Sequence, residues 1–130
     1  MENYYDLDSN RIFTRGVKDF NTINSDTDIV FKPVVYKSVL ENLYIINQYG
    51  MVINLASEAV VQSVLNKDGF PSVVLSGLYD NKFISDKFRI VDLVACSFIR
   101  NSEYYLERGY NAINKNGNVM DNYYTNIEYK

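Results

Sequence analysis

Histidine is absent from this chain of 130 residues, and cysteine occurs only once, at Cys96. A single cysteine excludes an internal disulfide, and without histidine the chain cannot build a compact zinc site of Cys and His ligands. The 6 glycines form no cluster that could cradle a phosphate, so no nucleotide-binding motif is present. Asp and Glu fall singly along the sequence, without paired carboxylates. We therefore expect neither a metal nor a cofactor.

Long hydrophobic runs are also lacking. The longest one covers residues 90–99, which is far shorter than the roughly 20 residues needed to cross a bilayer. Cys96 lies within it, so we expect a buried structural thiol rather than a nucleophile. The first residues, from Met1 to Asp6, contain neither the basic nor the apolar region of a secretory signal. We expect synthesis in the cytoplasm and no membrane partner.

Positive charge does not predominate, because 13 Lys and Arg stand against 16 Asp and Glu and leave a net charge of -3. Proteins that hold nucleic acid nonspecifically need clustered basic side chains. The densest group here, between Lys82 and Arg89, also contains Asp86. This distribution disfavours nucleic acid as a partner, although folding could still create a local basic patch. The residues that would form it are Lys82, Lys87, Arg89 and Arg100.

Aromatic residues are abundant but of two kinds only, with 12 Tyr, 7 Phe and no Trp. Tyr joins an apolar ring to a polar hydroxyl, which suits half-buried surfaces and contact sites. A codon bias that enriches Asn, Tyr, Ile and Lys together explains the same composition equally well. The hydrophobic content of 47% argues against global disorder. At this length it predicts one domain with a sizeable core.

Residues 1–28 differ from the rest of the chain. They are polar, rich in Asp, and show no sustained hydrophobic period. Their apolar residues are spaced as anchors of an extended N-terminal arm that folds onto a partner would be. A terminus that packs on its own domain is the other interpretation. The anchors that we nominate for partner binding are Tyr4, Tyr5, Ile12, Phe13 and Phe20.

From residue 29 onward, short apolar runs separated by turn residues predict strands. Gly50 lies between two of these runs and can supply the positive φ of a hairpin turn. The segment 57–65 is compatible with a short helix or with another strand, and the apolar spacing at 91–99 predicts a buried helix. The remaining strands are predicted at 28–32, 44–47, 51–54, 72–75 and 83–90. Strands followed by a helix and a loop-rich end indicate the α+β class.

Four segments then follow one another in a characteristic order. The first combines Phe31-Lys32-Pro33-Val34 with residues 44–52, and the second covers residues 65–75 around Gly69. The third is Val91-Asp92-Leu93-Val94-Ala95, and the fourth extends over residues 111–129. In this order they resemble the strand module and the finger of the HNH homing endonucleases found in phages. The resemblance implies a domain at residues 29–130, in which a small antiparallel sheet module precedes a degenerate HNH finger of the ββα type.

The departures from that family concern its chemistry. Where the family has N-H-I-D, with histidine as the general base, this chain has Asn111-Ala112-Ile113-Asn114. Val91 occupies the other position where the family has histidine, and Asn111 would be a poor neutral metal ligand. In the family a later metal ligand follows an N-L-E-W segment. The sequence stops at Lys130, directly after the corresponding residues 126–129, so we expect that ligand to be missing.

These departures predict a nuclease fold without nuclease chemistry. We expect a non-enzymatic structural or interaction protein, specifically a phage virion or assembly component whose partners are other phage proteins in a symmetric assembly. It would be made in the host cytoplasm and, in that role, would enter the virion. The alternative is a nucleic-acid-binding regulator that keeps the HNH scaffold without cleavage. An inhibitor of a host enzyme fits the same composition, and an active nuclease is the least favoured interpretation.

Overall fold

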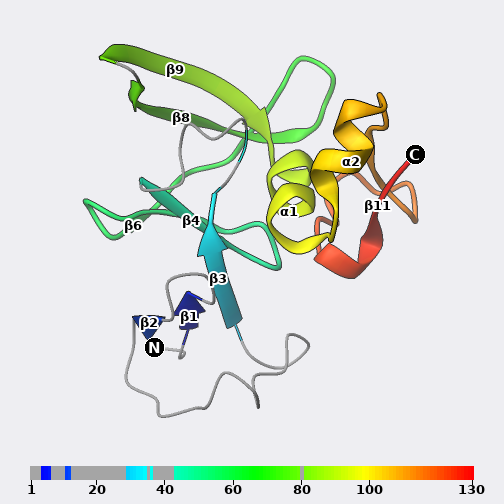
Figure 1. The fold of residues 1–130 in the computed structure, drawn as a ribbon, viewed down its shortest axis with the longest axis horizontal. Coiled ribbons are helices and arrows are strands. Elements are labelled where there is room, and N and C mark those ends of the chain that lie inside the picture. The colour runs from blue at the N-terminus through cyan, green and yellow to red at the C-terminus, as the bar shows by residue number, and fades with distance from the viewer. Residues whose placement is uncertain (1–3, 7–10, 13–28, 35, 37–42, 80) are drawn as a thin grey trace.

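The computed structural model describes residues 4–6, 11–12, 29–34, 36, 43–79 and 81–130, and it has an α+β architecture (Figure 1). Its strands form three separate sheets around a central helix, α1. The elements are β1 (Tyr4–Asp6), β2 (Arg11–Ile12), β3 (Ile29–Pro33), β4 (Tyr44–Asn47), β5 (Val52–Asn54), β6 (Ala59–Val60), β7 (Val64–Leu65), β8 (Pro71–Tyr79), β9 (Lys82–Arg89), α1 (Ile90–Phe98), α2 (Ser102–Glu107), β10 (Ala112–Asn114), the 3-10 turn η2 (Tyr124–Asn126) and β11 (Ile127–Tyr129).

The largest sheet has six strands in the order β2-β1-β3-β4-β5-β6. β1 pairs with β3 in parallel, and the other neighbours are antiparallel. The predicted hairpin around Gly50 is confirmed, because β4 and β5 pair across that turn and Gly50 has a φ of 95°. The Asn47 carboxamide oxygen accepts hydrogen bonds from the backbone N–H groups of Tyr49 and Met51. Local side-chain bonding therefore holds the turn.

A long hairpin of β8 and β9 forms a second sheet, with the short strand β7 on the outer side of β8. Tyr79 pairs with Lys82, which leaves a two-residue turn in which Asn81 has a φ of 63°. Asn tolerates this left-handed conformation better than most residues. β8 is longer than the predicted strand at 72–75, and the ambiguous segment 57–65 forms the strands β6 and β7 rather than a helix.

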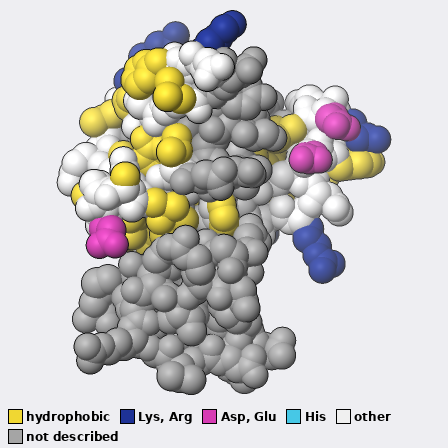
Figure 2. All heavy atoms as spheres, turned by 60° about the vertical axis from the view of Figure 1, so that its left-hand side comes forward, with side chains coloured by type: hydrophobic (Ala, Val, Ile, Leu, Met, Phe, Trp, Pro, Cys, Tyr) yellow, Lys and Arg dark blue, Asp and Glu magenta, His cyan; other side chains and the backbone are white. Residues whose placement is uncertain are grey.

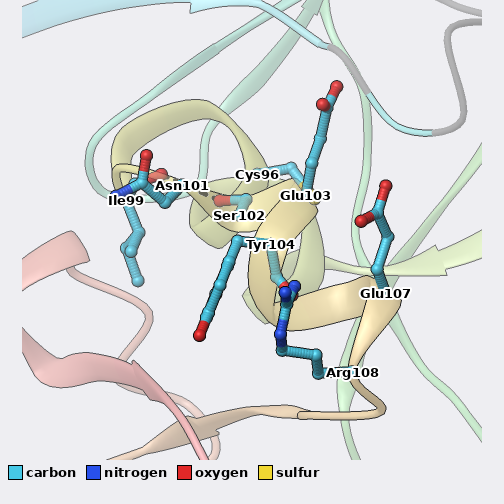
Figure 3. A pocket seen from close by; sticks show the side chains of 8 residues that line it. All are labelled: Cys96, Ile99, Asn101, Ser102, Glu103, Tyr104, Glu107 and Arg108. Atoms are coloured by element: carbon cyan, nitrogen blue, oxygen red, sulfur yellow. Dashed lines mark hydrogen bonds between the residues drawn. The ribbon is translucent and has the colours of Figure 1, made fainter.

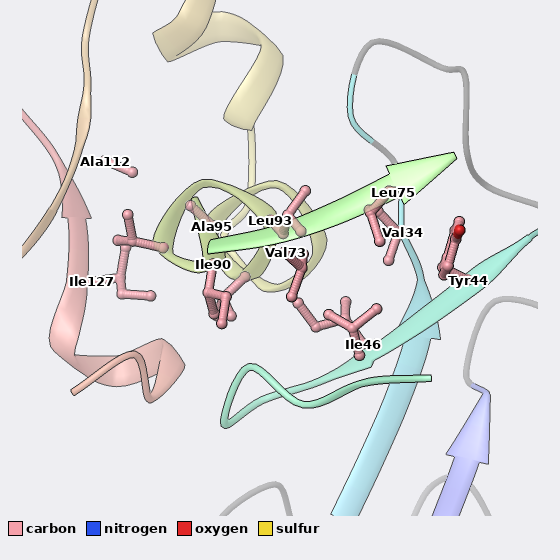
Figure 4. Packing of buried hydrophobic residues seen from close by; sticks show 13 residues of the cluster. Val34, Tyr44, Ile46, Val73, Leu75, Ile90, Leu93, Ala95, Ala112 and Ile127 are labelled. Carbon is pink, nitrogen blue, oxygen red and sulfur yellow. The ribbon is translucent and has the colours of Figure 1, made fainter. Parts of the chain in front are cut away.

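Helix α1 lies where the three sheets meet, and its apolar side chains form the centre of the core (Figure 4). Leu93 and Val94 are buried on it, as the spacing at 91–99 predicts, whereas Phe98 and Ile99 are only partly buried. Cys96 is partly buried, so it is less covered than the buried structural thiol that the sequence predicts. The opposing residues come from β4, β5, β8 and the C-terminal finger, and they are Tyr44, Ile46, Val52, Val73, Leu75, Ala112 and Ile127.

The C-terminal finger consists of β10 and β11, which pair antiparallel and pack against α1 together with η2. Helix α2 precedes the finger and is an element that the sequence did not predict. Of the predicted arm, the structure describes only β1 and β2, whose backbones join the six-stranded sheet; Phe13 and Phe20 lie outside the described residues. The division of the chain at residue 28 stays a prediction. Within the described part of the chain, no helix is long and apolar enough to span a membrane.

Candidate functional site in the C-terminal finger

The position that the family resemblance assigns to the general base is part of the core. Ala112 opens β10, lies opposite Tyr129 in the register, and is only 3% exposed. Its methyl group belongs to the apolar cluster around α1. Val91, the second position at which the family has histidine, is 2% exposed on α1. Both side chains are hydrocarbons packed away from water, so neither can take a proton.

Asn111, beside Ala112, lies on the surface and pairs through its backbone. Its N–H donates to the carbonyl of Lys130 at 3.0 Å, and the N–H of Lys130 donates back to the carbonyl of Asn111 at 2.8 Å. This reciprocal pair extends the β10–β11 ladder by one step. The visible role of Asn111 is thus to close the finger. Among the described residues, no group of three or more His, Cys, Asp or Glu side chains is placed to hold a metal ion.

A small cavity of about 180 Å³ opens beside Ala112. Arg89 is the charged residue among those that line it, and its guanidinium donates two hydrogen bonds of 2.9 Å to the carboxylate of Asp92. It also lies 4.7 Å from the centre of the Phe70 ring. The hydrogen bond to Asp92 raises the pKa of Arg89, so this side chain stays a cation. The other lining residues are Phe70, Ala112, Ile113, Asn114, Gly117 and Val119.

Asparagine side chains hold the finger in shape, as its composition indicates. The amide of Asn114 donates to the carbonyl of Asp121 at 2.8 Å and to the carboxamide oxygen of Asn122 at 2.9 Å. Asn126 donates to the same Asp121 carbonyl at 2.9 Å. Asn114 and Asn122 are 8% and 5% exposed, and buried amides of this kind stabilise only while they are hydrogen-bonded. The finger is therefore a fixed shape held by its own polar groups.

The four basic residues nominated for nucleic-acid contact do not form one patch. Lys82 and Lys87 lie an odd number of residues apart on an uninterrupted strand, so their side chains project from opposite faces of β9. Arg89 is paired with Asp92 just before α1 begins, whereas Arg100 follows the other end of that helix. The structure therefore spreads these charges over several surfaces.

A larger, open cleft of about 570 Å³ runs along α2, and the sequence did not predict it (Figure 3). Several of its lining residues come from α2 and the residue after it, with Glu103 and Glu107 extending from one side of the helix and Tyr104 and Arg108 from the other. The Arg108 guanidinium stacks on the Tyr104 ring at 3.6 Å. Burial raises the pKa of Cys96, which also lines the cleft, and its sulfur lies 3.8 Å from the Tyr129 hydroxyl. A protonated, partly covered thiol is a poor nucleophile.

The two most exposed large apolar side chains among the described residues lie on the β8–β9 hairpin. Leu78 and Phe83 lie directly opposite each other near its turn and are 70% and 71% exposed. Val74 lies on the same face, four residues before Leu78, and is 48% exposed. In Figure 2, hydrophobic side chains gather on the face that includes this end of the molecule, with Lys or Arg groups at its upper edge. The sequence carries no period-two alternation that could have indicated this face, because Val73, Val74 and Leu75 are consecutive in β8 and Phe83 is next to Ile84 in β9.

No protein-family model matches the chain, and no curated protein matches its sequence. The chain is similar to a solved structure described as "DNA binding and cleavage by the HNH homing endonuclease I-HmuI". Sequence identity is 25% and the TM-score is 0.61, over 77% of this chain and 51% of that one. The fold is HNH-like, and the similarity spans about half the length of the endonuclease.

Proposed function

We propose that this chain is a non-enzymatic interaction protein that uses an HNH-like fold as a scaffold. The observation that carries the proposal is the burial of Ala112, since a methyl group packed against α1 takes the place that the resemblance gives to a proton acceptor. Cleavage of a phosphodiester by the HNH mechanism needs such an acceptor beside a metal ion. Asn111 next to it is engaged through its backbone in closing the finger.

The β8–β9 hairpin supports a protein as the partner. Its exposed pair, Leu78 and Phe83, presents apolar surface of the kind that a binding partner covers. The distribution of charge also favours a protein over a nucleic acid as the partner. Residues 1–28 carry six acidic and three basic side chains, and residues 29–130 carry ten of each. The HNH-like domain is thus neutral overall, without the excess of positive charge that favours phosphate backbones. A role as a phage virion or assembly component is the specific setting that we propose, and it rests on the family resemblance.

A second candidate function is DNA binding without cleavage. It is favoured by the similarity to a structure described as a DNA-binding and DNA-cleaving endonuclease. In this chain Lys82, Lys87 and Arg100 would supply the phosphate contacts, because Arg89 is held by Asp92. Their separation predicts weak binding with a strong salt dependence.

Light scattering on the purified protein, with and without duplex DNA at about 50 mM salt, separates the two functions. An interaction protein keeps the same molar mass when DNA is added, and DNA incubated with Mg²⁺ or Mn²⁺ stays intact. A discrete complex with DNA would instead establish the second candidate. Metal-dependent cleavage by the purified chain would contradict both.

A further inference from the structure

Strand β9 lies at an open edge of its sheet. The sheet order is β7-β8-β9, so β8 covers one side of β9 and no described strand covers the other. β9 is eight residues long and pairs with β8 without interruption from Lys82 to Arg89. Alternate residues of such a strand direct their backbone N–H and C=O groups away from the sheet. Edges of this length are pairing templates unless their side chains prevent it.

Charged residues on an edge strand commonly serve as that protection, so their positions decide the outcome. β9 carries Lys82, Asp86 and Lys87 on exposed positions. When two copies of one strand pair antiparallel, each residue of one copy faces a residue of the other, and the backbone groups of both must point toward the other strand or both must point away from it. Because this direction alternates along a strand, the numbers of two facing residues differ by zero or by an even number. The two-fold axis of the pair therefore passes between the two copies of one and the same residue.

This restriction leaves few registers, and the charges select among them. With Asp86 or Lys87 at the axis, like charges face each other directly, which opposes pairing. With Ser85 at the axis, none of the charged side chains of β9 faces an opposite charge. With Ile84 at the axis, Lys82 of each copy faces Asp86 of the other. That register is the one in which opposite charges lie across from each other, and they do so twice.

The apolar side chains of the hairpin fit the same register. Ile84 meets its own copy at the axis, on the face of β9 that also carries Lys82 and Asp86. On the other face, Phe83 lies opposite Ser85 of the second copy, which makes the two Phe83 rings diagonal neighbours within reach of each other. Phe83 is 71% exposed in the single chain, so pairing would remove a large apolar surface from water.

We propose that two copies of this chain associate through β9, antiparallel and with Ile84 on the two-fold axis, to form one continuous sheet from both hairpins. This inference rests on the proposed function and deepens it by naming a second copy as a partner. The interface is isologous, with each copy contributing the same residues.

Sedimentation velocity over a range of concentrations at about 50 mM salt tests the pairing, because low salt leaves surface charges unscreened. The full chain should be a dimer. Lys82→Asp and Asp86→Lys should each weaken dimerisation by about tenfold, since each removes two attractive pairs and creates two repulsive ones. The double variant Lys82→Asp/Asp86→Lys should restore the dimer, which no loss of folding could do. Lys87→Asp is the matched control, because its position faces Asn81 in this register, and it should leave the dimer unchanged.

Three results would overturn the inference: a monomer at every concentration, a double variant as weak as the single ones, or an equal effect of Lys87→Asp. These outcomes are distinct from those that test the proposed function. A monomer that does not bind DNA would contradict the strand pairing but would be consistent with a non-enzymatic interaction protein. A dimer that binds DNA would support the strand pairing and contradict the preference for a protein partner.

Discussion

The hydroxyl group of Tyr44 is hydrogen-bonded to both backbone polar groups of Ser76. It donates to the Ser76 carbonyl at 3.1 Å and accepts from the Ser76 N–H at 3.1 Å. Tyr44 is buried on β4 and Ser76 lies on β8, so this single side chain joins the six-stranded sheet to the long hairpin. The surface that we assign to partner binding is therefore anchored to the core at the middle of β8.

Replacing Tyr44 with Phe should lower the free energy of unfolding by about 1–3 kcal/mol, because the backbone groups of Ser76 lose their partner. Urea denaturation measures the change, and faster hydrogen exchange at the Ser76 amide should accompany it. Tyr49→Phe is the control, since half of that side chain is exposed, and it should change stability by less than about 0.5 kcal/mol. Equal effects of the two substitutions would show that the Ser76 contacts contribute nothing.

Gly50→Ala should be strongly destabilising. Gly50 has a φ of 95°, and a Cβ there would lie 2.5 Å from a methyl carbon of Ile90 in the core. We expect a loss of at least about 2 kcal/mol in urea denaturation, from backbone strain and overpacking together. Gly117→Ala is the matched control, because its φ is 75° and no atom lies within 4 Å of the added Cβ. Gly117→Ala should lower the free energy of unfolding by the backbone cost alone, about 1 kcal/mol. If Gly50→Ala were no more destabilising than Gly117→Ala, the clash with Ile90 would be excluded as a cause.

Ala112→His should not create a nuclease. The side chain would enter a position that is 3% exposed, so we expect destabilisation by about 1–3 kcal/mol from overpacking. No cleavage of duplex DNA with Mg²⁺ or Mn²⁺ is expected, because one added imidazole does not complete a metal site, and no group of three or more His, Cys, Asp or Glu side chains among the described residues is placed to hold the ion. A gel assay on the purified variant, with circular dichroism to confirm folding, measures both. Metal-dependent cleavage would show that the remaining site is intact and would contradict the proposed loss of chemistry.

Alkaline solution should weaken the fold. Burial raises the pKa of Tyr129, Cys96 and Tyr36 above their ordinary values of 10.0, 9.0 and 10.0. The unfolded chain then loses these protons at lower pH than the folded chain does, so their contribution is complete below about pH 9 and declines as pH rises further. Thermal unfolding between pH 7 and 11 should show this decline.

Tyr129→Phe should make that decline shallower, because it removes one of the three ionising groups. Tyr110→Phe is a suitable control, since the Tyr110 side chain is 43% exposed. If the control changed the pH dependence as much as Tyr129→Phe does, burial of Tyr129 would not be the cause.

Part of the site can be predicted without a structure. The lack of histidine and the presence of Ala112 are properties of the sequence, and they exclude an imidazole base at any position of this chain. The β4–β5 hairpin and α1 follow from Gly50 and from apolar spacing, which are local signals. Short strands such as β6 and β7 are decided by neighbours distant in sequence, so the segment 57–65 is ambiguous until those neighbours are in place.

The sequence by itself determined that no imidazole is available and which residue types are present for contact. Only the tertiary structure decided how they are grouped. It buries Ala112 against α1, pairs Arg89 with Asp92, and turns Lys82 and Lys87 to opposite faces of β9. It also leaves Leu78 and Phe83 exposed on a hairpin whose strand β9 has no described strand beyond it. The reason is physical: composition sets the charges and apolar area, whereas burial and pairing depend on strands and helices that meet only after folding.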